Sequence, residues 1–478
     1  MSNRLPHLAP SPALLAEFAA IVGPAHALTD PDAQLPYLRE WRDMFLGRAA
    51  VVLRPGSTGE VSKLLALANA NRVAVVPQAG NTGLVGGQVP HEHGAEIVVS
   101  VARLDKVRSV DPSGTSMVVD AGVTLADAQA AAARAGRLFP LSLPSEGSCR
   151  IGGNLSTNAG GVGGLAYGNT RSLVLGVEAV LADGRIIHGL KALKKDNTGY
   201  DLKDLLIGAE GTLGIITAAV LKLFPLPAEK ATAFVALPAI EDALELLKLA
   251  DGTAGRGLTA FEFIPRIAMD FVTRHVPGAR EPFPTRYDWY ALLEVSGARA
   301  DGTAARDMEA LLTTATERGV ILDAVLATSM QQSRDFWRLR EGISEAQKPE
   351  GGNIKHDVSV PIARIPEFIA RANVLVERVC PGARPIPLGH FGDGNVHYNI
   401  AQPVGMDKAT FLTKWDAIGD VVHGLVAEMD GSISAEHGIG RLKRRSLAKF
   451  KSPVELELMR GIKAVFDPNG IMNPGKVL

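Results

Sequence analysis

The sequence has few cysteines and almost no net charge. Its two cysteines, Cys149 and Cys380, lie far apart and form no Cys-x-x-Cys pair, so we expect buried thiols in a reducing compartment rather than a disulfide framework. Lys and Arg number 50 and Asp and Glu number 51, which gives a net charge of −1. This balance excludes a global field that would recruit nucleic acid or an anionic membrane.

Long apolar runs and targeting segments are also missing. No uninterrupted apolar run reaches about 18 residues, which predicts the absence of a membrane-spanning helix. The first seven residues have neither the apolar core of a signal peptide nor the Arg/Ser-rich pattern of an amphipathic presequence. We therefore expect a cytoplasmic protein, and the missing presequence favours a prokaryotic one.

Glycine, by contrast, is abundant, with 50 residues. It is concentrated in three clusters of the N-terminal half, at residues 80–87, 144–164 and 208–214. Neither G-x-G-x-x-G nor G-x-x-x-x-G-K-[ST] occurs in its proper context, which weakens a Rossmann or P-loop interpretation. Small side chains in series let backbone N–H groups approach a ligand closely. The clusters therefore predict a cradle for a pyrophosphate and a planar ring system, and tight turns between strands are the alternative.

With 478 residues, the chain is expected to form two or three domains. A strand at 49–55, a helix opened by Ser57 and Glu60, and a strand at 73–77 make a strand–helix–strand unit. After Pro225, strands alternate with amphipathic helices, which predicts an antiparallel sheet with helices on one face. These strands are expected at 232–237, 289–296, 321–326 and 354–359, and the helices at 240–249, 303–318, 330–347, 363–379 and 408–429. The predicted domains are 1–226, 227–430 and a C-terminal segment, 431–478.

A histidine-bracketed turn, His390 to His397, lies in the second of these domains. Its central residues, Gly392-Asp393-Gly394-Asn395, stand between two strand-like runs and predict a hairpin. If the hairpin closes symmetrically, His390 and His397 face each other with their Cβ atoms about 5 Å apart, which lets both imidazoles reach one cation. Glu436 and His437 follow about forty residues later. Two histidines and a carboxylate form the ligand set of a catalytic divalent-metal site, whereas the alternative is two partly buried histidines with local hydrogen bonds.

Six motifs resemble those of FAD-linked 2-hydroxyacid dehydrogenases with the vanillyl-alcohol-oxidase fold, and D-2-hydroxyglutarate dehydrogenases in particular. They occur in the family's order and span nearly the whole chain. The motifs are Pro77-Gln78-Ala79-Gly80-Asn81-Thr82-Gly83-Leu84, Gly153-Asn154-Leu155-Ser156-Thr157-Asn158-Ala159-Gly160-Gly161, Gly211-Thr212-Leu213-Gly214-Ile215-Ile216-Thr217, Gly389 to His397, Ala435-Glu436-His437-Gly438-Ile439-Gly440 and Asn473-Pro474-Gly475-Lys476.

The resemblance implies an α+β fold with a two-subdomain FAD-binding domain, an α+β substrate domain with an antiparallel sheet, and a short helical C-terminal segment that returns to the FAD domain. Some family members bind flavin covalently through a histidine in the first glycine loop. This loop has Asn81 and Thr82 and no histidine, so we expect non-covalent FAD. The implied FAD-binding residues are Pro77, Gln78, Ala79, Gly80, Asn81, Thr82, Gly83, Leu84, Gly86, Gly87, Pro144, Ser145, Gly147, Ser148, Gly152, Gly153, Asn154, Ser156, Thr157, Asn158, Gly160, Gly161, Gly163, Gly211, Ile215 and Asn473.

A 2-hydroxyacid must lose a hydroxyl proton and a hydride, and isoalloxazine accepts the hydride. We expect His390, His397 and Glu436 to hold a divalent metal, with zinc the best fit and manganese or iron as alternatives. His437 is the expected general base, and the alternative is a fourth ligand or an orienting residue.

Substrate carboxylates need cationic partners. The resemblance assigns this role to Arg340 and Lys355, with a hydroxyl from Ser344 on the helical face that Arg340 occupies. Some relatives have Thr at the Ser344 position. Asn395 is expected to hydrogen-bond the substrate. For Arg340 and Lys355 the alternative is solvated surface charge.

The predicted activity is oxidation of D-2-hydroxyglutarate to 2-oxoglutarate, and D-lactate, D-malate or glycolate are alternative substrates. We expect an external electron acceptor, such as an electron-transferring flavoprotein or a quinone. The sequence does not fix the oligomeric state, and a homodimer is one alternative. A zinc hydrolase would leave the glycine clusters unexplained. A non-catalytic flavin scaffold would not need the set of His390, His397, Glu436 and His437.

Overall fold

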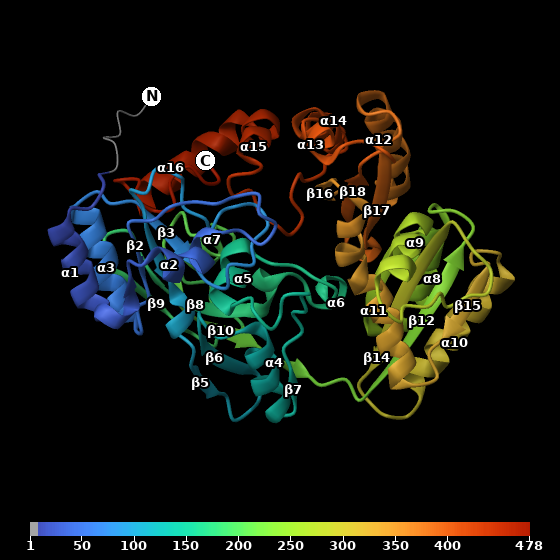
Figure 1. Ribbon diagram of the computed structural model, residues 1–478. Coiled ribbons are helices and arrows are strands. Elements are labelled where there is room, and N and C mark those ends of the chain that lie inside the picture. Colours follow the sequence, from blue (N-terminus) through green and yellow to red (C-terminus); the bar gives the residue numbers. More distant parts are fainter. Residues whose placement is uncertain (1–7) are drawn as a thin grey trace. The chain divides into compact units, whose positions relative to one another are not determined.

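The computed structural model describes residues 8–478, which divide into two compact units (Figure 1). The first contains the chain up to Gly161, Gly168–Pro225 and Glu436–Leu478. The second contains Val162–Tyr167 and Leu226–Ala435. The segment that begins at Glu436 therefore belongs to the same unit as the glycine clusters.

The first unit has a small mixed sheet and a five-stranded antiparallel sheet, ordered β1-β2-β4-β3 and β5-β6-β10-β8-β9. A third sheet pairs β7 with β11. The strands are β1 (Ala27–Leu28), β2 (Val51–Leu53), β3 (Val75–Gln78), β4 (Ile97–Ser100), β5 (Val107–Val110), β6 (Ser116–Asp120), β7 (Arg137–Leu138), β8 (Val174–Val180), β9 (Ile186–Gly189), β10 (Ile215–Lys222) and β11 (Phe224–Pro225). The helices are α1 (Pro12–Val22), α2 (Pro31–Leu38), α3 (Thr58–Ala70), α4 (Leu125–Arg134), α5 (Ile151–Thr157), α7 (Leu202–Leu206), α15 (Arg444–Phe450) and α16 (Pro453–Phe466).

The predicted strand–helix–strand unit is confirmed as β2, α3 and β3. The Ser57 hydroxyl accepts a hydrogen bond from the Glu60 backbone N–H, which caps the first turn of α3. Because β2 and β3 both pair in parallel with β4, their apolar side chains are buried on both faces. Met472 forms a parallel bridge with Val75 of β3, so the last residues of the chain (red) lie beside an N-terminal strand (blue) in Figure 1.

The second unit is built on a seven-stranded antiparallel sheet with the order β15-β12-β14-β13-β17-β18-β16. Its strands are β12 (Glu229–Leu237), β13 (Leu258–Pro265), β14 (Trp289–Gly297), β15 (Asp323–Leu326), β16 (Asn353–Ser359), β17 (Arg384–His390) and β18 (Asn395–Ala401). Its helices are α6 (Gly164–Tyr167), α8 (Asp242–Ala254), α9 (Arg266–His275), α10 (Thr303–Glu317), α11 (Met330–Ala346), α12 (Ile365–Val379), α13 (Lys408–Leu412) and α14 (Trp415–Glu428).

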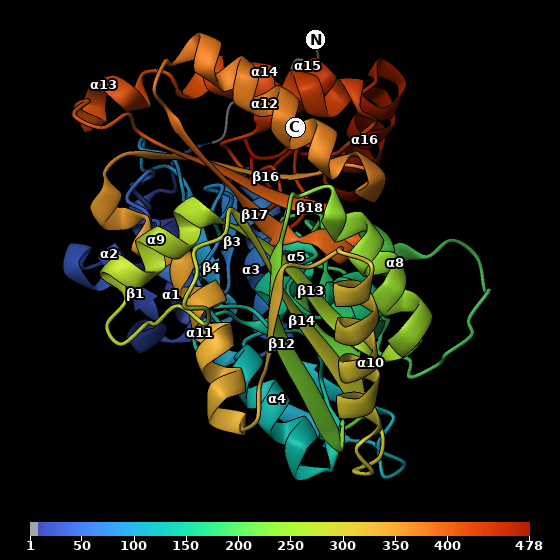
Figure 2. The same cartoon turned by 90° about the vertical axis from the view of Figure 1, so that its right-hand side faces the viewer.

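The antiparallel sheet is confirmed, but the prediction of helices on one face is wrong. Alternate residues of β12 pack into two separate cores, Ala233 and Val235 with α8 and α10, and Phe234 and Ala236 with α9 and α11. Both faces of the strands are apolar, so both need a helical cover. Figure 2 shows β12 and β14 between these two pairs of helices. The predicted helix 408–429 is two helices, because the Lys414 N–H bonds to the Phe411 carbonyl, three residues back, and tightens the chain there.

Candidate active site

The three glycine clusters of the first unit meet in space. A Cβ on Gly80 would lie 2.4 Å from the Ser148 carbonyl oxygen, so the loop after β3 approaches the segment before α5 at backbone distance. The Glu210 N–H donates to the Ser156 carbonyl at 2.7 Å, which joins the third cluster to α5. A Cβ on Gly87 would lie 3.2 Å from the Glu210 carboxylate. The predicted cradle residues of this unit are therefore neighbours.

The second cluster is partly helical, which the sequence analysis did not predict. Gly152, Gly153, Asn154, Ser156 and Thr157 lie in α5 rather than in a loop. A Cβ on Gly152 would lie 2.7 Å from the Cβ of Ala121. Small residues here let the helix pack closely, so glycine content alone did not distinguish this helix from a loop.

The remaining predicted FAD residues lie around these elements. Pro77 and Gln78 end β3, and residues 79–87 form the loop that follows it. The turn before α5 contains Pro144, Ser145, Gly147 and Ser148; Asn158 is the left-handed C-cap of α5, and Gly160 and Gly161 follow it. Gly211 precedes β10, Ile215 begins it, and Asn473 lies in the tail, whereas Gly163 belongs to the second unit.

Two asparagines of the first unit fit a bound polar ligand. Asn81 has φ 54°, and its amide donates to the carbonyls of Pro36 and Arg39 at 2.8 and 2.9 Å. The Asn473 amide donates to the carbonyls of Gly87 and Glu210 at 2.9 and 2.8 Å. The Oδ1 atom of each is buried without a hydrogen-bond partner among the residues that the structure describes. A buried acceptor without a donor is costly, so both positions suit a ligand that brings donors.

In the second unit, the histidine hairpin forms with a different register from the symmetric one. His390 lies opposite Asn395, and His397 lies opposite Leu388. The turn is the 3-10 segment Phe391–Asp393 followed by Gly394 at φ 85°, so it takes four residues instead of six. His390 and His397 are therefore diagonal neighbours on one face, and their ring centroids are 5.4 Å apart. The predicted proximity is confirmed, although direct opposition is wrong.

A buried ion network adjoins His390. Glu262 of β13 pairs with His390 across the strands, is fully buried, and lies 2.6 Å from the His390 Nδ1. The Arg340 guanidinium of α11 donates through Nε to the other oxygen at 2.8 Å. Burial opposes ionisation of Glu262, but the charges of His390 and Arg340 outweigh it and hold its pKa below the ordinary value. Arg340 is therefore a buried, paired residue and not solvated surface charge.

His397 has a similar carboxylate neighbour. Its Nδ1 lies 3.6 Å from an oxygen of Asp357, which is buried and lies directly opposite on β16. The Asn395 amide donates to the same oxygen at 3.0 Å and to the Val358 carbonyl at 3.0 Å. Carboxylates bonded to the second ring nitrogen typically orient metal-binding imidazoles. This arrangement suits metal-ligating histidines. The Oδ1 atom of Asn395, in contrast to its amide nitrogen, is buried without a hydrogen-bond partner in residues 8–478.

Strand alternation places the predicted residues of the second unit on one face of its sheet. Ile354 and Val358 of β16 pack in the core with α12 and α14, so Lys355 and Asp357 point to the opposite face. Ile386 and Leu388 of β17 pack with α9 and α11, which puts His390 on that same face. Arg340 reaches it from α11. Ser344 lies one turn later on α11, as the helical spacing predicts, and is exposed.

Glu262 and Asp357 were not predicted from the sequence. Glu262 stands alone among apolar residues in Leu258–Pro265, a strand that was not predicted. A single charge inside an apolar run was the available signal, since a buried carboxylate requires partners.

Glu436 and His437, the other predicted residues, begin the C-terminal segment of the first unit. A Cβ on Gly160 would lie 2.8 Å from Oε1 of Glu436. Glu436 therefore borders the second glycine cluster. The predicted metal ligands are divided between the units, with His390 and His397 in the second and Glu436 in the first.

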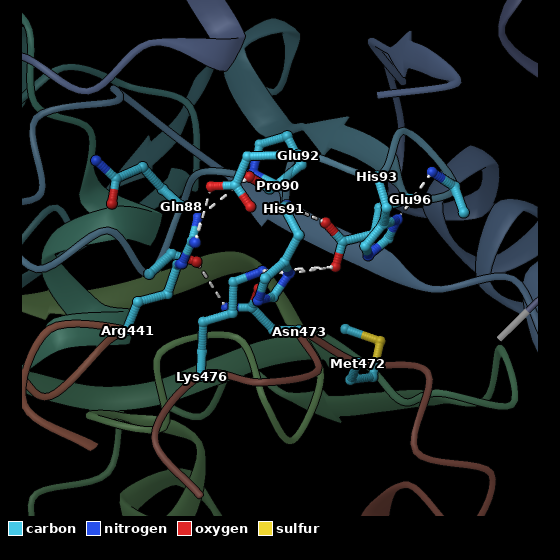
Figure 3. A network of polar contacts seen from close by, with 12 residues as sticks. Gln88, Pro90, His91, Glu92, His93, Glu96, Arg441, Met472, Asn473 and Lys476 are labelled. Carbon is cyan, nitrogen blue, oxygen red and sulfur yellow. Dashed lines mark hydrogen bonds and ion pairs between the residues drawn. The ribbon is translucent and has the colours of Figure 1, made fainter. Parts of the chain in front are cut away.

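Polar contacts join the C-terminal tail to the segment after β3 within the first unit (Figure 3). The Lys476 ammonium lies 3.6 Å from Glu96 and 3.4 Å from the His91 Nδ1, and Arg441 pairs with Glu92 at 3.0 Å. Lys476 and Glu96 are buried. Burial opposes ionisation of Glu96, but the His91 hydrogen bond and the Lys476 charge lower its pKa to about 2. His91, His93 and Glu96 could also surround a metal, yet the Lys476 ammonium already supplies a cation there.

Comparison with known proteins places this arrangement in a family. Residues 226–477 match the C-terminal domain of FAD linked oxidases, and residues 49–189 match an FAD binding domain. The chain belongs to the FAD-linked oxidases. The predicted family and the predicted FAD-dependent oxidoreductase are thus confirmed, and Asn81 and the first two glycine clusters lie within the matched FAD binding domain.

Curated relatives align over nearly the whole chain. The mitochondrial D-2-hydroxyglutarate dehydrogenase of Arabidopsis thaliana is 39% identical over 462 residues, which cover 96% of this chain and 80% of the relative. The D-2-hydroxyglutarate dehydrogenase of Stutzerimonas stutzeri (strain A1501) is 37% identical over 470 residues, which cover 98% and 99%.

Solved structures confirm the predicted fold. A p-cresol methylhydroxylase with bound substrate superimposes with a TM-score of 0.76 at 15% identity, covering 97% of this chain and 96% of the other. As the sequence predicts, no helix within residues 8–478 is long and apolar enough to cross a membrane.

Proposed function

We propose that this FAD-dependent enzyme oxidises D-2-hydroxyglutarate to 2-oxoglutarate with a divalent metal, and passes the electrons to an external acceptor such as an electron-transferring flavoprotein or a quinone. The names of the curated relatives suggest the substrate. The observation that carries the metal is the pair of imidazoles, 5.4 Å apart on one sheet face, each with a buried carboxylate near Nδ1.

His390, His397 and Glu436 are the proposed metal ligands, and zinc suits this set of nitrogen and oxygen donors best. Glu262 would fix the orientation of the His390 imidazole by accepting from its Nδ1, and the Asp357 carboxylate, 3.6 Å from the His397 Nδ1, lies beside the second imidazole. Bound FAD supplies a hydride acceptor, and a bound divalent cation supplies a Lewis acid. We also propose that FAD is held without a covalent bond, because the loop after β3 carries Asn81 and Thr82 where a histidine would be needed.

The protein's own residues bind the substrate and move its proton. His437 takes the proton of the 2-hydroxyl group, which a neutral imidazole can do near pH 7. Lys355 and Arg340, on one face of the second unit's sheet, bind carboxylate groups. Glu262 accepts a hydrogen bond from Nε of Arg340. This bond fixes the orientation of the guanidinium for a bidentate contact with a substrate carboxylate. The buried Oδ1 of Asn395 suits a hydrogen bond from the substrate hydroxyl.

A substrate panel with an artificial electron acceptor tests this assignment. The variant is Lys355→Met, because Arg340→Ala would also remove the partner of buried Glu262. The matched control is Lys230→Met, a lysine of the same sheet that pairs with Glu294 at 2.9 Å. We expect Lys355→Met to raise KM for D-2-hydroxyglutarate at least tenfold and KM for D-lactate less than threefold, since only the dicarboxylate needs a second cationic contact.

Lys230→Met should leave both KM values within twofold of the wild type. Equal effects of Lys355→Met on the two KM values would contradict the assignment of D-2-hydroxyglutarate as the substrate. The relative kcat/KM values of D-lactate, D-malate and glycolate would then decide between these alternatives.

A further inference from the structure

Glu210 occupies an unusual position in the first unit. It stands in the third glycine cluster, adopts a left-handed backbone with φ 52°, and is 9% exposed. Its side chain accepts two backbone hydrogen bonds, from Ile439 at 2.7 Å and from Gly440 at 2.8 Å. These donors lie two and three residues after His437, in a different part of the sequence.

Glu210 also contacts two other segments of the first unit through its main chain. Its N–H donates to the Ser156 carbonyl of α5 at 2.7 Å, and its carbonyl accepts from the Asn473 amide at 2.8 Å. The same Asn473 amide donates to Gly87. One residue therefore joins α5, the loop after β3 and the C-terminal tail to the turn that carries His437.

The turn is held from its other side by the loop after β3. The N–H groups of Arg441 and Leu442 donate to the Val85 carbonyl at 2.8 and 3.1 Å. A Cβ on Gly440 would lie 2.3 Å from that carbonyl, and Gly440 has φ 50°. Gly438 is equally constrained, because a Cβ there would lie 2.7 Å from the Glu210 carboxylate. The backbone directly after His437 thus lies between Val85 and Glu210.

Burial disfavours an ionised carboxylate at this position. Burial raises the pKa of Glu210 to about 7, although both backbone hydrogen bonds and the Lys443 charge favour ionisation. A buried carboxylate that lowers the stability of the folded chain is typical of a functional site, where the position of a group is kept at the expense of folding stability.

We propose that Glu210 is a positioning residue, whose carboxylate holds the turn after His437 against the loop after β3 and so fixes where the His437 imidazole meets the substrate. This inference rests on the proposed role of His437. Glu210 acts through the main chain of Ile439 and Gly440, and it does not touch the reacting atoms.

The test is anaerobic flavin reduction by D-2-hydroxyglutarate, measured by stopped flow on protein with its FAD bound. Glu210→Gln keeps the shape of the side chain but turns an amide N–H toward one of the two backbone donors. We expect a limiting reduction rate at least tenfold below the wild type, with the apparent substrate Kd and the flavin content within twofold.

Asp467→Asn is the matched control. Asp467 is fully buried and likewise accepts from two backbone N–H groups of the tail, those of Ile471 and Met472 at 3.0 and 2.8 Å, and its side chain pairs with Lys463 rather than with the backbone after His437. Its substitution should lower the melting temperature and leave the reduction rate per bound flavin within twofold of the wild type.

A second background separates positioning from general support. If Glu210 acts through His437, Glu210→Gln should change the rate less than twofold in a His437→Gln protein. Equal losses in both backgrounds, or a wild-type rate for Glu210→Gln, would overturn the positioning role. A wild-type rate for His437→Gln would instead overturn the proposed proton step itself. If Glu210→Gln does not yield flavin-loaded protein, Glu210→Asp replaces it with the same criteria, because the shorter carboxylate cannot reach both donors.

Discussion

The buried triad of Glu262, Arg340 and His390 allows a quantitative prediction. Glu262 is fully buried, and its two oxygens lie 2.6 Å from His390 and 2.8 Å from Arg340. Glu262→Gln removes the negative charge and leaves the Arg340 guanidinium buried without its counter-ion. Breaking a buried pair in this way costs about 3–5 kcal/mol, so we expect the free energy of unfolding to fall by that amount.

The double variant sharpens this prediction. Arg340→Met alone should also be destabilising, because Glu262 then loses one of the two groups that keep it ionised. Glu262→Gln/Arg340→Met removes both charges, so its loss should be smaller than the sum of the single losses by about 2 kcal/mol or more. Glu367→Gln is the control, since the Glu367 side chain is 45% exposed and pairs with Arg364 and Arg371 at the surface, and it should cost no more than about 1 kcal/mol.

Chemical denaturation followed by tryptophan fluorescence provides the assay, because Trp289, Trp337 and Trp415 all lie in the second unit. The zinc affinity should fall in parallel by about 10–100-fold for Glu262→Gln, the usual effect of removing a carboxylate that orients a metal-binding histidine. Additive losses in the double variant, or a loss below about 1 kcal/mol for Glu262→Gln, would refute the reasoning that these charges depend on each other.

Two further predictions concern the first unit. Glu96 has a pKa of about 2 in the folded chain, below the ordinary 4.5, so its stabilising contribution of about 3 kcal/mol is present above pH 4.5 and is lost as the pH falls toward 2. The difference in unfolding free energy between wild type and Glu96→Gln should therefore shrink across this range, and a difference that does not vary with pH would contradict the pairing with His91 and Lys476. Acid precipitation should release the yellow FAD into the supernatant, whereas colour retained in the washed pellet would show a covalent bond.

The sequence predicted the features that depend on local pattern. The strand–helix–strand unit around Ser57 was readable from its cap, and most strands of the second unit were readable from their apolar runs. The hairpin was predicted from its glycines, but its register was not, because residue types do not reveal that the turn uses four residues. That register decides that His390 lies opposite Asn395, whereas the separate pairing of β16 with β18 places His397 opposite Asp357.

The features that the sequence did not reveal depend on long-range contacts. β13 and its Glu262 were missed because the charge interrupts an apolar run, and its partners Arg340 and His390 lie 78 and 128 residues away. Helical spacing places Ser344 one turn after Arg340, but only the packing of α11 against α9, β12 and β14 decides that Arg340 is buried and Ser344 exposed. Glu210 was counted as part of a glycine motif, and its bonds to Ile439 and Gly440 span about 230 residues.

Metal-dependent reduction of the flavin by D-2-hydroxyglutarate is the central claim, and one anaerobic titration tests it. The holoenzyme is treated with a chelator, its FAD content is checked by absorption, and D-2-hydroxyglutarate is added before and after zinc is returned. We predict that the visible flavin band persists in the stripped protein, and that it bleaches in the untreated and zinc-restored samples. Bleaching of the stripped protein at the rate of the untreated enzyme would contradict the account.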